Sequence, residues 1–298
     1  MPSVQFLARL VRPREQRQTD ALSNPVLLKR LGDVCPIHGV PMLQLNIPVK
    51  IAGEEQPRKP SPVCPKCAKE QRDKKEEEMA KESMKRNLYL RTYDVLMRDS
   101  TIPEELKSAS FDNFIARTQE EKNLLDFVKR QTQKYLDGVG GNTLLTGTTG
   151  IGKTHLTIAM AKTLNETFKE RGTPKSVLFV NLTEILRKVR ESFKFESKEG
   201  YYSRLLMEVD YLILDDLGVK QSDSGRSKSA WEEEFIFDVL SHRKNTIIST
   251  NLSNDEIANL YSERVASRIR TGLEGNVFKA LNIKDKRYTL NQLKQLEG

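Results

Sequence analysis

The stretch GTTGIGKT, Gly147 to Thr154, decides the fold of this 298-residue chain. It has the spacing G-x-x-x-x-G-K-[ST], follows the apolar run 143–145 and precedes a helical pattern that begins near Lys153. Glycines let the backbone curl so that successive N–H groups point at phosphate oxygens, and the start of the helix adds its positive dipole end. The alternative is a chance glycine-rich turn. The pattern predicts a phosphate-binding loop (P-loop) that holds a nucleoside triphosphate.

The residue types of this loop assign a role to each position. Lys153 would neutralise the β- and γ-phosphates, and the hydroxyl of Thr154 would ligate Mg²⁺. The loop and the first turn of the helix would together bind the nucleotide. The residues concerned are Gly147, Thr149, Gly150, Ile151, Gly152, Lys153, Thr154 and His155.

Two later apolar runs end on polar residues that suit the same site. The run YLILDD at 211–216 would place Asp215 at the end of a buried strand to hold Mg²⁺, with Asp216 beside it to polarise the attacking water. A simple turn before the next glycine is the alternative. The run TIISTN at 246–251 ends on Asn251, a candidate for orienting the water or sensing the γ-phosphate.

Short apolar runs alternate with amphipathic helical stretches from about Ser110 onward. Such alternation predicts an α/β fold in which a parallel sheet is flanked by helices. The runs that read as strands are 143–145, 177–180, 211–214 and 246–249. Before this region, residues 68–99 mix acidic and basic side chains without Gly or Pro, which predicts one long helix. We therefore expect domains at 1–67, 68–109 and 110–298.

The N-terminal region contains all three cysteines in two short motifs, Cys35-Pro-Ile-His38 and Cys64-Pro-Lys-Cys67. A two-residue gap lets a tight turn aim both ligands at one ion, so two such motifs predict a tetrahedral Cys₃His zinc site. Free thiols and a surface histidine are the alternative. Residues 1–34 are expected to be partly helical, 42–47 to form a short strand, and a bound zinc would fold the proline-rich segment between the motifs.

Charge and hydropathy exclude some classes of protein. The formal net charge of +8 suits a polyanionic partner without proving one. No apolar run approaches the roughly 18 residues of a membrane span, and residues 1–11 are too short for a secretory signal. A cytoplasmic protein is expected.

Together these motifs resemble the DnaC/DnaI-type helicase loaders, within the AAA+ clade that also contains the DnaA initiators and the IstB transposition ATPases. The likeness covers roughly residues 110–286. It implies an ATPase, with ATP and Mg²⁺ as cofactors, whose subunits assemble side by side so that each site is completed by an arginine from the next subunit. By motif position Arg268 resembles the arginine finger and Arg264 a supporting residue. The stretches that carry the resemblance are 110–114, 152–156, 212–218, 249–251 and 263–270.

The resemblance also implies partners. Residues 181–206 correspond to an inserted helical element that faces single-stranded DNA, where basic side chains track phosphates and aromatic rings stack on bases. An ordinary amphipathic helix with core aromatics is the alternative. DnaI-type loaders carry an N-terminal zinc module that contacts the replicative helicase, although the ligand spacing here departs from theirs and such modules also bind DNA. The insert residues concerned are Lys188, Arg190, Lys194, Lys198, Arg204, Phe193, Phe195, Tyr201 and Tyr202.

The sequence therefore predicts an ATP-dependent loader that self-associates through its ATPase domain and places a DnaB-type hexameric helicase onto single-stranded DNA during replication initiation. It would act in a bacterial cell, or in an infected host cell if a phage encodes it. An IstB-like ATPase that assists a transposase is the alternative within the same fold. A small-molecule P-loop kinase and a zinc adaptor with a vestigial ATPase are the alternatives from other classes.

Overall fold

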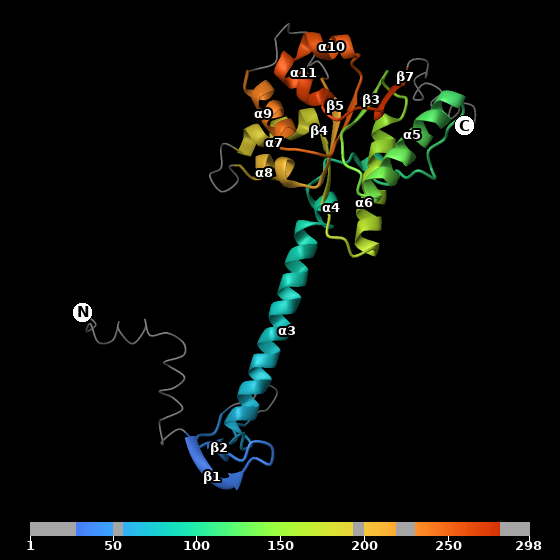
Figure 1. Ribbon diagram of the computed structural model, residues 1–298. Helices are drawn as coiled ribbons and strands as arrows, with labels where there is room; N and C mark the ends of the chain where they lie inside the picture. Colours follow the sequence, from blue (N-terminus) through green and yellow to red (C-terminus); the bar gives the residue numbers. More distant parts are fainter. Residues whose placement is uncertain (1–27, 50–55, 193–199, 219–229, 281–298) are drawn as a thin grey trace, which may run out of the picture. The chain divides into compact units, whose positions relative to one another are not determined.

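A computed structural model describes residues 28–49, 56–192, 200–218 and 230–280 of the chain (Figure 1). The chain divides into two compact units, residues 1–85 and 86–298. Most of the N-terminal stretch expected to be partly helical, residues 1–27, lies outside the described residues. Among the helices that are described, none combines the length and the apolar character needed to cross a membrane.

The first unit is built on an antiparallel hairpin of β1 (Leu28–Val34) and β2 (Pro41–Leu45). The strand expected at 42–47 is confirmed as β2. The helical expectation was wrong for the segment that forms β1. Leu28 and Leu31 have a spacing that suits a helix, but the segment pairs with β2, with Leu28 opposite Leu45 and a bulge between Arg30 and Val34.

The first unit has almost no apolar interior. Among its described residues, only Cys35 and Cys64 are buried. Isolated bridges join Leu43 to Val63 and Val49 to Arg58, so the proline-rich segment is held to the hairpin by a few backbone hydrogen bonds. A module of this size needs a source of stability other than hydrophobic burial.

The charged segment forms two helices instead of the single helix expected over 68–99. Helix α3 (Pro65–Arg91) begins inside the second cysteine motif and buries none of its residues. The chain then turns, and α4 (Val95–Asp99) begins at two residues that are buried, Val95 and Leu96. The expectation was wrong because the spacing of charged residues indicates a helix, but it does not indicate where the helix is interrupted so that apolar side chains can pack in the core.

The second unit contains a five-stranded parallel sheet in the order β4-β5-β6-β3-β7. The four strands expected from the apolar runs are confirmed, and the fifth, β7, was not predicted. The strand bounds are β3 (Thr143–Gly147), β4 (Val177–Asn181), β5 (Tyr211–Leu217), β6 (Thr246–Thr250) and β7 (Val277–Ala280). Strand β6 lies between the P-loop strand β3 and the acidic strand β5.

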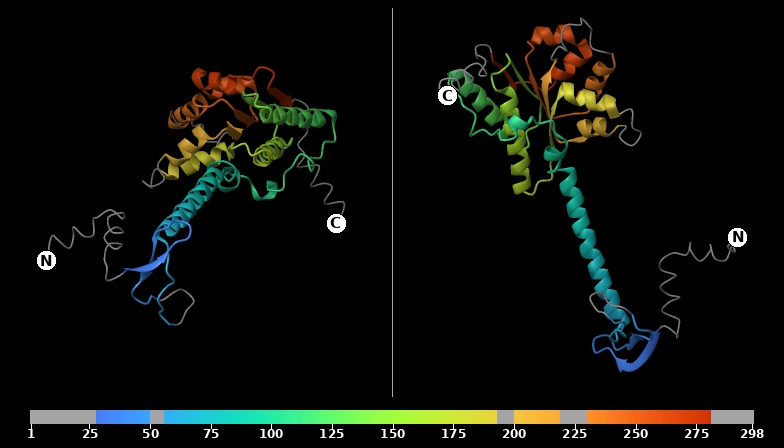
Figure 2. Two further views of the ribbon diagram at one scale, coloured as in Figure 1. Left: turned by 60° about the horizontal axis from the view of Figure 1, so that its bottom comes forward. Right: turned by 180° about the vertical axis from the view of Figure 1, so that it is seen from behind.

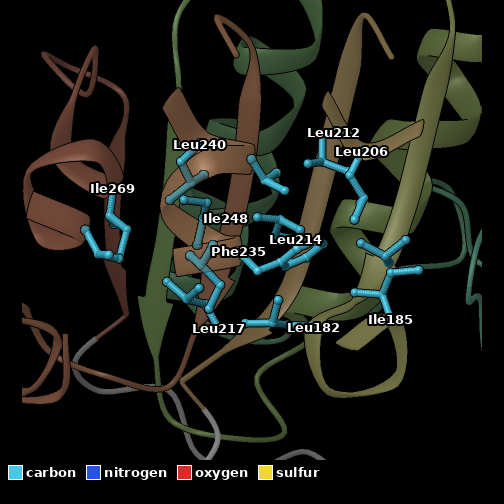
Figure 3. Close-up of a cluster of buried hydrophobic side chains, with 14 of the residues drawn as sticks. Leu182, Ile185, Leu206, Leu212, Leu214, Leu217, Phe235, Leu240, Ile248 and Ile269 are labelled. Carbon is cyan, nitrogen blue, oxygen red and sulfur yellow. The ribbon is translucent and has the colours of Figure 1, made fainter. Parts of the chain in front are cut away.

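Helices cover both faces of this sheet (Figure 2). Alternate residues of one strand enter opposite cores, since Tyr211 and Ile213 pack in one cluster and Leu212 and Leu214 in the other. Helices α5 (Gln119–Leu136) and α6 (Lys153–Glu170) cover the first face. The second cluster, shown in Figure 3, joins α7 (Leu182–Ser192), α8 (Tyr201–Glu208), α9 (Ala230–Ser241), α10 (Asn254–Leu260) and α11 (Glu263–Arg270).

The segment after α4 covers the free edge of strand β4. Thr101 N–H donates to Phe179 O at 2.9 Å, and Phe179 N–H donates to Ser100 Oγ at 3.0 Å. Asn181 N–H donates to Thr101 Oγ1 at 2.6 Å. These bonds satisfy an edge that would otherwise present unpaired backbone groups, and they anchor Asn181 at the end of its strand.

Candidate nucleotide and metal sites

The P-loop connects the end of β3 to the start of α6, as expected from the sequence. Gly147, Gly150 and Gly152 all have positive φ angles, 149°, 77° and 97°. A Cβ on Gly147 would meet Ala280 O at 2.7 Å, and a Cβ on Gly152 would meet the Phe114 ring at 2.5 Å. The loop therefore requires glycine at these places both for its curvature and for the close approach of neighbouring chain segments.

The side chain of Lys153 contacts the backbone of the P-loop and the end of a neighbouring strand. Its Nζ donates to Gly147 O at 2.6 Å, to Thr148 O at 2.9 Å and to Asn251 Oδ1 at 2.8 Å. Asn251 follows β6, so two residues predicted for one site from distant stretches do come together. An incoming phosphate would offer the ammonium group a charged acceptor in place of neutral oxygens.

Thr154 and Asp215 meet at the place expected for Mg²⁺. Thr154 Oγ1 donates to Asp215 Oδ2 at 2.9 Å, and the hydroxyl of Ser249 donates to Asp215 Oδ1. Burial raises the pKa of Asp215 to about 6, against the opposing effect of the Ser249 hydrogen bond. A hydroxyl and a carboxylate side by side are oxygen ligands of the type that Mg²⁺ takes, so the residues fit the cation.

Asp216 occupies a backbone conformation that is rare for a residue with a side chain. Its φ is 57°, and it lies where the pairing of β5 with β6 shifts register between Leu214 and Leu217. A left-handed residue other than glycine costs about 1–2 kcal/mol, and such strain clusters at functional sites. The bulge leaves Asp216 less buried than Asp215, and Asn181 Nδ2 donates to Asp216 Oδ2 at 3.1 Å.

Two residues of this site were not assigned a role from the sequence. Ser249 holds the second oxygen of Asp215, and Asn181 holds Asp216 while its Oδ1 accepts from Glu184 N–H at 3.2 Å. Both lie at or near the C-terminal ends of strands that neighbour β5. Polar residues at those strand ends were the available signal.

The side chain of His155, a residue predicted to bind the nucleotide, contacts the segment before α5. Its Nε2 lies 2.9 Å from Ser110 O, and its ring meets Phe114 edge-on with centroids 5.5 Å apart. The imidazole therefore fastens the segment 110–114 to the start of α6. Its backbone remains in the first turn of that helix.

Arg264 and Arg268 lie on one exposed face of α11. Arg264 Cζ lies 4.4 Å and Arg268 Cζ 5.7 Å from the centroid of the Phe237 ring on α9. Arg264 also lies 3.8 Å from a carboxylate oxygen of Glu234. Their assignment as an arginine finger and its support stays a prediction.

The four residues of the two cysteine motifs come together in the first unit. The potential ligand atoms of Cys35, His38, Cys64 and Cys67 all lie within 4.8 Å of one another. His38 Nδ1 lies 3.2 Å from Cys67 Sγ and 3.7 Å from Cys64 Sγ, and the sulfurs of Cys35 and Cys67 are 3.7 Å apart. A tetrahedron with Zn–S bonds of about 2.3 Å has edges of roughly 3.7 Å, so the cluster fits zinc.

The protonation chemistry and the surroundings of the cluster also suit a cation. The backbone N–H of His38 lowers the pKa of Cys35 to about 6, so this thiol ionises readily. Burial raises the pKa of Cys67 to about 11, so this thiol keeps its proton at neutral pH until a bound cation displaces it to solvent. The other ring nitrogen of His38, Nε2, lies 2.9 Å from Glu70 Oε1 on α3. This pairing leaves Nδ1 free to face the sulfurs.

The described part of the basic insert offers little support for the expected contact with single-stranded DNA. Lys188 pairs with Glu184 at 3.1 Å, and Arg190 pairs with Glu232 while it lies over the Trp231 ring. Arg204 Nε donates to Gly200 O at 3.4 Å. Lys194, Lys198, Phe193 and Phe195 lie outside the described residues.

The two tyrosines of the insert differ from each other. Tyr202 packs against the second core cluster, which favours the alternative that this ring is a core aromatic of an ordinary amphipathic helix. Tyr201 is 41% exposed and donates its hydroxyl to Asp99 Oδ1 at 3.0 Å. A DNA-facing role for the insert stays a prediction.

Comparison with known proteins gives matches of three kinds. The family described as IstB-like ATP binding protein matches residues 70–272, well over half of the chain. The uncharacterized protein YdaV of Escherichia coli (strain K12) is 24% identical over 189 residues, which cover 62% of this chain and 71% of that protein.

Two solved structures are similar at the level of the backbone. The DnaC helicase loader has a TM-score of 0.49 and 21% identity over 61% of this chain and 100% of that chain. AMPPCP-bound DnaA from Aquifex aeolicus has a TM-score of 0.46 and 20% identity over 66% of this chain and 57% of that chain.

Proposed function

This chain belongs to the family of IstB-like ATP-binding proteins, and from that membership we propose that it is an assembling AAA+ ATPase that loads a DnaB-type hexameric helicase onto single-stranded DNA. The observation that carries the ATPase half of the proposal is the contact between Thr154 and Asp215 at the open end of the P-loop. Replication initiation in a bacterial cytoplasm is the setting in which such a loader would act.

The site residues divide the work of hydrolysis. The N–H groups of the loop and the ammonium of Lys153 would bind the triphosphate, and Thr154 with Asp215 would hold Mg²⁺. When bound, Mg²⁺ supplies positive charge that offsets the charge of the phosphates. Asp216 would accept a hydrogen bond from the attacking water, with Asn181 fixing the orientation of the carboxylate. Asn251 would orient the same water or contact the γ-phosphate.

Completion of the site in trans would couple hydrolysis to assembly. Arg264 and Arg268 are exposed on α11, so they are accessible to a second copy of the chain. Positive charge supplied by a neighbour stabilises the transferring phosphoryl group only when that neighbour is docked. A lone copy would accordingly be a slow ATPase.

The N-terminal part, residues 1–67, would be a zinc module that docks onto the helicase, and residues 68–109 would link it to the ATPase domain at 110–298. Support for the zinc comes from the Cys₃His cluster and from the near absence of other buried residues in the described part of this unit. Metal binding would then supply the folding free energy that hydrophobic burial does not. The same module would be free to contact DNA.

Co-purification tests the loader function directly. The full chain, tagged and loaded with ATP, should retain the replicative helicase of its host, and the Cys64→Ser variant should lose it while keeping ATP binding. The family membership itself favours one second candidate, an ATPase that assists a transposase. Retention of a transposase but not of the helicase would replace the first function by the second.

A further inference from the structure

The ring of Phe237 lies beneath both arginines of α11. Phe237 belongs to α9, is half-buried, and has Arg264 Cζ at 4.4 Å and Arg268 Cζ at 5.7 Å from its centroid. A guanidinium within about 6 Å of a ring centroid is attracted by the negative face of the ring. One aromatic side chain therefore contacts two cations that are four residues apart on the neighbouring helix.

The two arginines are not held equally. Arg264 lies closer to the ring and also lies 3.8 Å from Glu234 Oε1, one helical turn before Phe237 on α9. Both members of that ion pair are more than half exposed, so the pair orients the Arg264 side chain but adds little stability. Arg268 has the longer ring contact, which leaves it the easier of the two to extend toward another molecule.

We infer that Phe237 is a positioning residue for the arginines that complete the ATP site of an adjacent copy. This inference rests on the proposed function. A long arginine side chain loses much conformational entropy when it is fixed in one rotamer. Because the ring already restricts both guanidinium groups, less of this entropy is lost when a neighbouring copy docks. Arg264 is the anchored member, and Arg268 extends from the same platform to the phosphates.

The expected size of the effect follows from the type of contact. Cation–π contacts at exposed sites change equilibria by about two- to fivefold each. Replacement of Phe237 by Leu keeps an apolar side chain against the core and removes the ring. It should lower assembly-dependent kcat by about four- to 25-fold for the two arginines together and leave the KM for ATP unchanged.

Mixed assemblies separate this role from a structural one. One copy carries Asp216→Asn, so that it supplies arginines but does not hydrolyse ATP, and the other carries Arg268→Ala, so that it holds ATP but supplies no finger. Mixing the two should restore hydrolysis that neither shows alone. Phe237→Leu should then lower the rate when it is placed on the Asp216→Asn copy and have no effect on the Arg268→Ala copy.

Two further variants sharpen the result. Phe237→Tyr keeps the ring and should restore the rate, whereas Phe235→Leu, on the same helix but stacked on Trp231, should have equal effects on both copies. A loss that is the same whichever copy carries Phe237→Leu would overturn the inference and leave the proposed function standing. Failure of the two parent copies to restore hydrolysis on mixing would overturn completion of the site in trans, and the inference with it.

Discussion

Asp215→Asn should make the nucleotide-free protein more stable while it removes the Mg²⁺ dependence of ATP binding. Asp215 is 2% exposed, and burial raises the pKa of its carboxyl to about 6 from an ordinary value of 3.8. A tenfold change in acidity corresponds to about 1.4 kcal/mol, so the buried carboxylate costs the folded state roughly 3 kcal/mol at neutral pH. An amide of the same shape avoids that cost. The value of roughly 3 kcal/mol is an upper limit for the increase in stability, because the hydroxyls of Ser249 and Thr154, which donate to the carboxylate, must find other acceptors.

The sign of the pH dependence follows from the raised pKa. Below about 3.8 the Asp215 carboxyl is protonated in the folded and the unfolded chain, so it carries no penalty there. The penalty grows as pH rises between the two values and is complete above about 6. The advantage of the Asn variant should therefore be largest at pH 8 and shrink as pH falls toward 4.

Urea unfolding in the presence of a chelator measures this difference. The chain has one tryptophan, Trp231 on α9, whose fluorescence reports the second unit. Asp210→Asn is a matched control of opposite sign, since Lys175 and Ser176 lower the pKa of Asp210 although burial opposes them. A variant Asp215→Asn that is less stable than the unaltered protein at pH 8, or a difference that does not vary with pH, would refute the reasoning.

Three other changes test separate parts of the account. Lys153→Ala should abolish ATP binding in an equilibrium titration, because the ammonium is the loop's only side-chain cation, and unchanged affinity would overturn the assignment. Arg268→Ala should keep ATP affinity and lose the hydrolysis that assembly stimulates, and equal loss of both would remove it from the finger role. Glu70→Gln should weaken zinc binding by about tenfold in a chelator competition, because its carboxylate orients His38. Glu77→Gln on the same helix is the control, and equal affinities of the two variants would contradict the role of Glu70.

The sequence predicted the P-loop and its partners well because their signal is local. Each motif lies within one loop or at one strand end, and the C-terminal ends of neighbouring parallel strands meet at the same edge of a sheet. The contacts of Thr154 with Asp215 and of Lys153 with Asn251 agree with this expectation, while the roles of these residues stay predictions. The metal cluster was predictable for the same reason, since the ligands of each motif are only three residues apart, in a turn for the first motif and at the start of α3 for the second.

The remaining features depend on contacts between distant segments. β1 lies in a stretch that was expected to be partly helical, because its pairing with β2 is set across the turn and not by its own spacing. The left-handed conformation of Asp216 coincides with a register shift between β5 and β6, which no short pattern reveals. Phe237 looks like an ordinary core aromatic in sequence, and only the packing of α9 against α11 sets it beneath two arginines.

A double-mutant cycle on Mg²⁺-dependent ATP binding tests most directly whether the loop and the acidic strand share one cation. The affinity for a fluorescent ATP analogue would be measured with Mg²⁺ and with chelator in the unaltered protein, in Thr154→Val, in Asp215→Asn and in the double variant. We predict that each single change removes most of the gain that Mg²⁺ provides and that the second change removes no more. Retention of the full Mg²⁺ gain in either single variant, or losses that simply add, would contradict the account.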